Sequence, residues 1–271
     1  EICACLVGSE MCIRDRKDSL YMEITDSKSN PIKEMEDWCK ILPQKKWEVG
    51  RSAFELAKFI IEGAGITYIS DTINKLLNQE VKLERAIPEY NVDFDNLGNG
   101  RKHDLAIFGK VFGGNTERKV FIGIEAKVDE PFDRTVEERY MEGIKKLLNE
   151  KNSNLPERIL NLLKRYYPQI RKEHFKLRYQ LLFSLAGTVD YEADIHIFMV
   201  LVFKSKSYNT KKGISNLKDY QVFMDSINAL FLSTQENSYK AIVKNKAGVE
   251  KEVYSIYKIC LLYTSPSPRD M

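Results

Sequence analysis

The sequence predicts an α/β protein whose central mixed β-sheet is flanked by helices, in the order helix, three strands, helix, strand. Apolar strand-like segments are interleaved with amphipathic helical segments, which is typical of that class. The composition, 43% hydrophobic and 30% charged over 271 residues, excludes disordered and collagen-like chains. No apolar run approaches the roughly 18 residues of a membrane span, so we expect no membrane partner.

Both ends of the chain depart from this pattern. Residues 5–16, CLVGSEMCIRDR, and 260–271, CLLYTSPSPRDM, resemble translated sequencing adapter, a contaminant of metagenomic assemblies. The alternatives for residues 1–16 are a signal peptide or a metal-binding cysteine cluster, but the apolar run is short and the cysteines have no matching second half. We therefore assign 1–16 and 260–271 as non-native segments. Residues 17–259 form a single domain, in which Cys39 is the only cysteine and no disulfide forms.

Helical periodicity dominates the first part of the domain. Residues 50–63 place apolar side chains on one face and end in glycine, which predicts a helix that stops there. A second helix is expected near 69–79. The polar segment before them contains prolines, and it should form only a short helix over 32–41.

Three strands follow, at 84–95, 103–112 and 119–128. The second and third have apolar residues on both faces, which is typical of strands inside a sheet. The GGNTER segment between them predicts a tight turn. These two strands should therefore form an antiparallel hairpin.

The second half of the domain begins with a helix. Thr135 and Glu138 form a capping-box pattern that starts a helix reaching about residue 150. The continuous apolar run DIHIFMVLVF at 194–203 predicts another buried strand, and a terminal hairpin is expected over 239–259. Further helices are predicted at 156–166, 175–190 and 214–231.

Three charged residues interrupt the apolar hairpin near its open end. Glu125 and Lys127 are two residues apart on one strand, so their side chains point to the same face. If the turn is centred at residues 115–116, Asp104 on the other strand faces Lys127. Glu125 is then its diagonal neighbour, roughly 7–8 Å away, and two carboxylates at that spacing can bind one divalent cation.

These residue types fit metal-assisted hydrolysis of a phosphodiester. Mg²⁺ prefers oxygen ligands and binds through one or two carboxylates plus water and phosphate. The cation lowers the pKa of bound water, and a nearby lysine can orient that water or take its proton. The alternative is a partly buried network of the three charges, or strand ends that reach solvent, with no catalytic role.

The order of elements and charges resembles the PD-(D/E)XK nuclease superfamily, which has the restriction-endonuclease-like fold. Asp104 and Glu125-Ala126-Lys127 match its central motif, and the resemblance covers roughly residues 47–203. The chain is most similar to an uncharacterised bacterial family, through WEVGRSAFELA, KHDLAIFG, IGIEAKVDEPF and LRYQLLFSLAGT. His103 stands where the motif's name has proline, a loosely kept position.

The resemblance implies a role for each residue of the motif. Asp104 and Glu125 would be metal ligands, with the Ala126 carbonyl as a third. The metal would be Mg²⁺, with Mn²⁺ as a substitute. Lys127 would position or activate the attacking water.

Glu55 and Gln180 would complete the catalytic set. By the resemblance, Glu55 on the first helix matches an additional acidic residue, and Gln180 matches a polar residue near the scissile phosphate. From the residues alone, Glu55 shares a face with Lys58 and Glu62, as on a solvated helix, and Gln180 could cap a strand or face water. Arg51 could contact a phosphate or pair with Glu55.

We therefore expect a Mg²⁺-dependent nuclease of the cytoplasm that hydrolyses nucleic acid, DNA rather than RNA. The alternative is a catalytically inactive module of the same fold that binds nucleic acid or a protein. The net charge of +3 allows only local basic patches, and a homodimer would suit cleavage of both strands of a duplex. Basic pairs that could contact phosphate, or could be ordinary surface, are Arg101-Lys102, Arg118-Lys119, Lys145-Lys146, Lys164-Arg165, Arg171-Lys172 and Lys211-Lys212.

Overall fold

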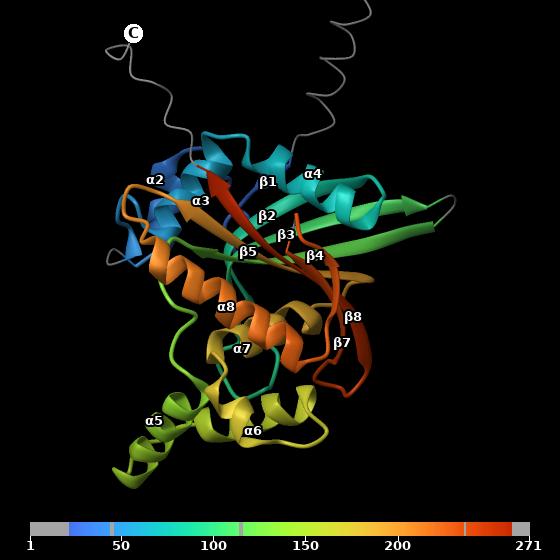
Figure 1. The fold of residues 1–271 in the computed structure, drawn as a ribbon. Coiled ribbons are helices and arrows are strands. Elements are labelled where there is room, and N and C mark those ends of the chain that lie inside the picture. Colours follow the sequence, from blue (N-terminus) through green and yellow to red (C-terminus); the bar gives the residue numbers. More distant parts are fainter. Residues whose placement is uncertain (1–21, 44–45, 114–115, 236, 262–271) are drawn as a thin grey trace, which may run out of the picture.

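A central mixed sheet with helices on both faces forms the body of the protein, as the sequence predicts (Figure 1). The computed structural model describes residues 22–43, 46–113, 116–235 and 237–261, and within them the sheet has eight strands. The strands are β1 (Glu23–Ile24), β2 (Val81–Val92), β3 (Arg101–Gly113), β4 (Thr116–Lys127), β5 (Ile195–Lys204), β6 (Leu230–Ser233), β7 (Ser238–Lys244) and β8 (Glu250–Leu261). Their order is β1-β2-β3-β4-β5-β8-β7-β6, so the predicted inner strands β3, β4 and β5 lie in the interior.

The helices divide between the two faces of the sheet (Figure 1). One face is covered by α2 (Met35–Ile41), α3 (Ser52–Ile61) and α4 (Gly65–Leu77), with α3 against β4 and β5 and α4 against β2. The other face is covered by α7 (Tyr179–Asp190) and α8 (Thr210–Ser226). The paired helices α5 (Val136–Leu148) and α6 (Leu155–Tyr166) lie below α7 in the view of Figure 1. A short 3₁₀ helix, η2 (Lys172–Lys176), leads into α7.

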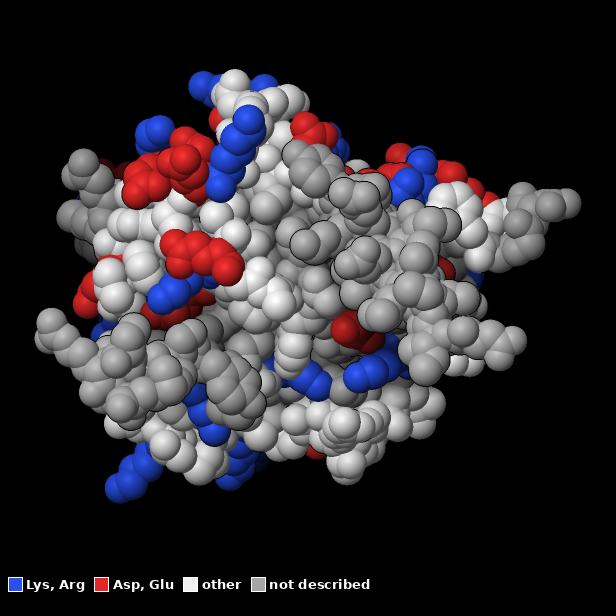
Figure 2. Space-filling view, turned by 90° about the horizontal axis from the view of Figure 1, so that it is seen from above, with Lys and Arg blue, Asp and Glu red and all other residues white. Residues whose placement is uncertain are grey.

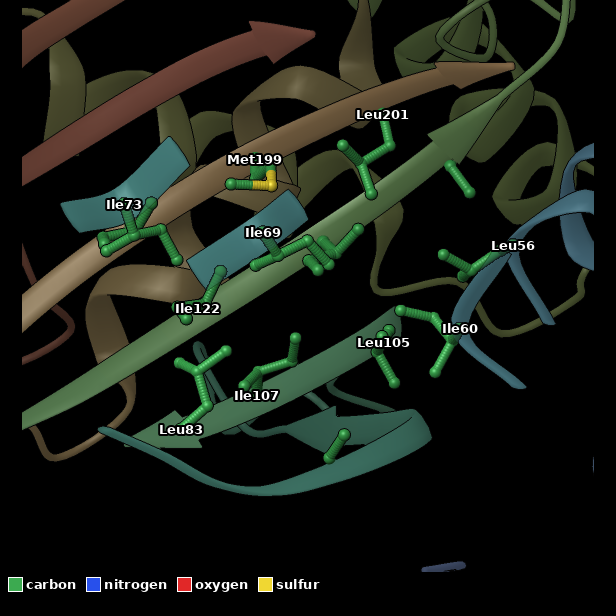
Figure 3. Packing of buried hydrophobic residues seen from close by; sticks show 14 of the residues in the cluster. Leu56, Ile60, Ile69, Ile73, Leu83, Leu105, Ile107, Ile122, Met199 and Leu201 are labelled. Atoms are coloured by element: carbon green, nitrogen blue, oxygen red, sulfur yellow. The ribbon is translucent and has the colours of Figure 1, made fainter. Parts of the chain in front are cut away.

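The two largest apolar clusters enclose the sheet. Under α3 and α4, branched aliphatic residues from the helices interlock with those of the inner strands (Figure 3). Burial of this surface is the main driving force for folding. The labelled members of the first cluster are Leu56, Ile60, Ile69, Ile73, Leu83, Leu105, Ile107, Ile122, Met199 and Leu201. The second cluster, under α7 and α8, includes Leu181, Leu185, Phe198, Val200, Tyr220 and Phe223.

The capping box predicted at the start of α5 is confirmed. The Thr135 hydroxyl accepts a hydrogen bond from the Glu138 backbone N–H at 3.2 Å, and the Glu138 carboxylate accepts one from the Thr135 N–H at 2.8 Å. These two contacts satisfy backbone N–H groups that have no partner inside the helix.

Several predicted helix boundaries are off by four or five residues. The helices expected to begin at 175 and 214 begin at Tyr179 and Thr210. The helix expected near 69–79 begins at Gly65, because this glycine can lie against the end of α3, where a Cβ would be 2.4 Å from the Phe59 carbonyl oxygen. The helix expected over 214–231 ends at Ser226, since Asn228 takes a left-handed φ of 53° and the chain turns into β6. Short apolar runs such as Leu230-Phe231-Leu232 fit a helix end and a strand equally well.

The predicted terminal hairpin is confirmed and slightly extended. β7 and β8 pair antiparallel, and β8 continues through Cys260, which is buried and pairs with Phe203 of β5. The ordered sheet thus includes the first two residues of the segment 260–271 that we assigned as non-native. The other assigned segment, 1–16, lies outside the described residues. Among the described residues, no helix combines the length and the apolar character that crossing a bilayer requires.

Candidate active site

The candidate site lies where β3 separates from β4. Their ladder begins at the pair Leu105 and Ile124, whereas β2 and β3 stay paired as far as Arg101. His103 packs near Gly123 and Gly187 on the α7 side, but Leu105 lies in the cluster under α3 and α4. Residues two apart in a regular strand share a face, so β3 is irregular at Asp104.

The register differs from the predicted one by two residues. Because Leu105 pairs with Ile124, continuing the ladder by one position sets Asp104 opposite Glu125, not opposite Lys127. The tip at 114–115 lies outside the described residues, and β3 and β4 reach Gly113 and Thr116 on either side of it. A slip of two residues keeps side chains on the same face, so the charged residues still meet.

Asp104 occupies the gap between the separating strands. It is half-buried, and its Oδ2 accepts a hydrogen bond from the Ala126 backbone N–H at 2.8 Å. On the neighbouring strand β2, the residue that faces Asp104 is Glu89, whose φ of 51° is left-handed. The neighbour of Asp104 on β2 is therefore held in irregular local geometry.

Glu125 is buried within a ring of donors. Its Oε1 accepts from the Lys127 ammonium at 2.8 Å and from the Gln180 amide at 2.5 Å. Its Oε2 pairs with the Arg101 guanidinium and accepts from the Ser184 hydroxyl at 3.4 Å. A carboxylate has about four acceptor positions, so protein donors occupy all of them.

Gln180 stands in the first turn of α7, beside the strands. Two glycines permit this close approach: a Cβ at Gly123 would lie 2.5 Å from Thr188 Oγ1, and one at Gly187 would lie 2.7 Å from Arg101 Cβ. Gln180 accepts from the Lys127 ammonium at 3.1 Å as well as donating to Glu125. Its contact with this pair agrees with the predicted placement at the site.

Glu55 is buried on α3, but it does not line the cavity. Its carboxylate accepts a hydrogen bond from the Gly50 backbone N–H, and burial raises its pKa. The solvated helix surface considered from the sequence is therefore wrong. Arg51 pairs with Asp129 at 3.1 Å, and not with Glu55.

A cavity of about 370 Å³ opens in front of the charged residues. Asp104, Glu125, Lys127 and Gln180 line it, while Trp38 and Leu42 of the α2 region form an apolar wall. Further charged groups also line the cavity. On the face of the molecule shown in Figure 2, acidic and basic side chains form separate small clusters. The complete lining is Trp38, Leu42, Lys46, Glu48, Arg51, Ser52, Ala53, Leu56, Glu89, Asp104, Glu125, Ala126, Lys127, Glu130 and Gln180.

The two carboxylates have opposite electrostatic surroundings. Burial and the negative charge of Glu125 raise the pKa of Asp104 to about 7, and Arg101 and Lys127 offset this only in part. Burial also opposes ionisation of Glu125, but the positive charges of Lys127 and Arg101 outweigh it and lower the pKa of Glu125. Asp104 is therefore the carboxylate that lacks a cation of its own.

The donor set at Asp104 fits a hard divalent cation. Among the described residues, no three Asp, Glu, His or Cys side chains are grouped as a metal cage. Two carboxylates with a backbone carbonyl from Ala126 match the sparse protein ligation of Mg²⁺, which keeps several waters and binds substrate phosphate. Glu125 could ligate only if one of its four donors moved away.

Two further residues of the site were not predicted from the sequence. Arg101 was grouped with the basic pairs, yet it is buried, contacts Glu125 and lies 4.9 Å from the centre of the Phe183 ring. Ser184 follows Gln180 by four residues, and that spacing places both on one helix face. The helical spacing of Ser184 was a usable signal, whereas nothing in the sequence distinguishes Arg101 from a surface arginine.

These features define an α/β protein with a buried carboxylate and lysine site at the ends of two inner strands of its central sheet. The chain matches the family model described as Domain of unknown function (DUF6946) over residues 31–256, and it belongs to that family. This range includes every residue of the cavity. No curated protein and no solved structure matches the chain.

Proposed function

We propose that this protein is a metal-dependent nuclease of the PD-(D/E)XK superfamily, acting on DNA rather than RNA. The observation that carries the proposal is the meeting of Asp104, Glu125 and Lys127 where two inner strands separate. Buried charges are costly unless they are paired or functional, and groups with shifted pKa values concentrate at active sites. The order of helix, three strands, helix and strand also supports it.

Each residue has a defined task in this proposal. Asp104 and the Ala126 carbonyl would hold a Mg²⁺ or Mn²⁺ ion, with Glu125 as a further ligand once one of its protein donors moves away. The ion would supply a water of lowered pKa and positive charge for the phosphate. Lys127 orients the attacking water and its ammonium charge stabilises the phosphate as negative charge builds up. Gln180 holds the Lys127 ammonium toward the cavity through their 3.1 Å contact.

The test is cleavage by the full chain on plasmid, linear duplex and single-stranded DNA, and on RNA. Each substrate is incubated with Mg²⁺, Mn²⁺ or EDTA. Lys127→Ala and Asp104→Ala should each reduce metal-dependent cleavage by about 100-fold or more. Matched controls are Lys82→Ala, an exposed lysine of β2, and Asp71→Ala, an exposed residue of α4, and both should cleave like the wild type. Cleavage that survives Lys127→Ala and Asp104→Ala would refute the assigned site.

One observation favours the second candidate, an inactive module that binds nucleic acid or a protein. All acceptor positions of Glu125 are taken by protein donors, so the acidic group is already neutralised without a metal. Calorimetry with Mn²⁺ separates the two candidates. Metal binding with cleavage supports the nuclease, whereas the absence of both supports the module. A homodimer and a cytoplasmic location belong to the same proposal, and sedimentation of the full chain tests the first.

A further inference from the structure

A lysine-rich segment lies between β5 and α8, next to the candidate site. Residues 204–212 read KSKSYNTKK and contain four lysines and no acidic residue. Lys204, Lys206, Lys211 and Lys212 are all exposed. We call residues 204–212 the lysine segment.

The lysine segment is fixed to the chain that forms the rim of the cavity. The Ser205 hydroxyl donates to the Gly50 carbonyl at 2.8 Å and accepts from the Ser207 N–H at 3.2 Å. Gly50, at φ 85°, is packed so closely that a Cβ would lie 2.8 Å from Ser207 Oγ. Gly50 directly precedes Arg51, which lines the cavity, so the segment has a defined position relative to the site.

Asp129 connects the lysine segment to the site. Arg51 and Lys212 approach the two oxygens of this buried carboxylate, at 3.1 Å and 3.6 Å. Asp129 follows Lys127 by two residues. One carboxylate thus separates two exposed cations, and positive charge extends from the cavity rim along the segment.

The charge of the lysine segment is mostly without a counter-charge. Among the described residues, no ion pair involves Lys204, Lys206 or Lys211, and only Lys212 has a carboxylate within 4 Å. Lys211 and Lys212 also stand in the first turn of α8, which has no acidic residue. Positive charge there is opposed by the partial positive charge of the helix N-terminus, so an anion would relieve an unfavourable arrangement.

We propose that the lysine segment binds the sugar-phosphate backbone of a nucleic acid strand whose neighbouring phosphate enters the cavity. This inference rests on the proposed function for the identity of the polyanion. Contacts of lysine with phosphate carry no base preference, so the segment positions the strand and contributes sequence-independent affinity. Nucleic acid is favoured over an anionic membrane because the lysine segment is attached to the rim of the cavity, where one strand could contact both the segment and the site.

The test measures binding apart from cleavage. Fluorescence anisotropy follows a labelled 20-base-pair duplex and a labelled single strand in EDTA, with Lys127→Ala in every protein to prevent cutting. The test variant is Lys206→Gln with Lys211→Gln. The control is Lys75→Gln with Lys82→Gln, which removes two exposed lysines on α4 and β2 near the closed end of the β3–β4 hairpin.

The test variant should bind duplex about 10- to 60-fold more weakly than the control at 0.1 M salt. The slope of log K against log salt should fall by about 1.8, from about 0.9 for each phosphate contact. Equal affinity of the two variants would overturn the inference, even if the wild type cleaves DNA. Loss of binding to phosphatidylserine vesicles with DNA binding unchanged would also overturn it. Binding that depends on the segment, in a protein that never cleaves, would support this inference and refute only the nuclease.

Discussion

The buried pair of Arg101 and Glu125 should be one of the strongest electrostatic couplings in the protein. Both side chains are almost fully buried, at 8% and 1% exposure, and Glu125 also contacts Lys127. Removing one partner of a buried pair costs about 3–5 kcal/mol, because a charge stays buried without its counter-charge. Lys127 continues to neutralise Glu125 in Arg101→Met, so we expect the lower end, about 3 kcal/mol.

The coupling follows from the same contacts. Glu125→Gln leaves the charges of Arg101 and Lys127 buried side by side, so it should also cost about 3 kcal/mol or more. The double variant removes one charge of each sign, and the free energy of unfolding should fall by less than the sum of the single losses. We expect a coupling of about 2 kcal/mol, within the range found for groups in contact.

Urea unfolding of the four proteins, in EDTA so that no divalent metal intervenes, gives this coupling. The matched control is the cross-strand pair of Lys240 and Glu252, joined at 2.7 Å but 35% and 46% exposed. Its cycle with Lys240→Met and Glu252→Gln should give less than about 1 kcal/mol. If the losses for Arg101→Met and Glu125→Gln add to within about 0.5 kcal/mol, the ring of donors around Glu125 is not an energetic unit.

Two further predictions concern packing and pH. Gly187→Ala should lower stability by about 1–3 kcal/mol, because the new Cβ would overlap Arg101. Alanine normally stabilises a helix interior by about 1 kcal/mol over glycine, so a rise in melting temperature would contradict the close approach of α7. Burial, with a smaller contribution from Lys251, lowers the pKa of His196, while Asp190 and the bond to the Tyr191 carbonyl act in the opposite direction. The neutral form is therefore favoured in the folded state, and stability should decline by up to about 1.4 kcal/mol per pH unit as pH falls below about 6.5. In His196→Gln this decline should be smaller, as measured by urea unfolding between pH 7 and pH 4.5.

The inner strands and the motif residues could be predicted because their signals are local. Continuous apolar runs identify β4 and β5, and spacing places Glu125 and Lys127 on one face. The capping box of α5 is also contained within four residues. Gln180 required the resemblance, since an amide in an amphipathic helix has no local signal of its own.

The errors have a different origin, which is packing between distant segments. Glu55 points to the backbone of Gly50 because of the rotation of α3 against the sheet, and a helical pattern does not fix that rotation to within one residue. The predicted pairing of β3 with β4 was off by two residues, because the turn was placed one residue too far along the chain. Arg101 became part of the site only because α7 lies close enough to bury it.

The shape of the site depends on residues that carry no charge. The regular alternation of side chains between the two faces of β3 must be interrupted between His103 and Leu105 for Asp104 to enter the gap. The left-handed backbone of Glu89, on the neighbouring strand β2, accompanies this interruption. On the other side, Gly123 and Gly187 let α7 bring its polar first turn to Glu125. A larger side chain at either glycine would separate α7 from the strands while leaving every charged residue in the sequence. A chain that keeps Asp104, Glu125 and Lys127 but replaces these glycines should therefore lose the site's geometry, which the motif alone would not reveal.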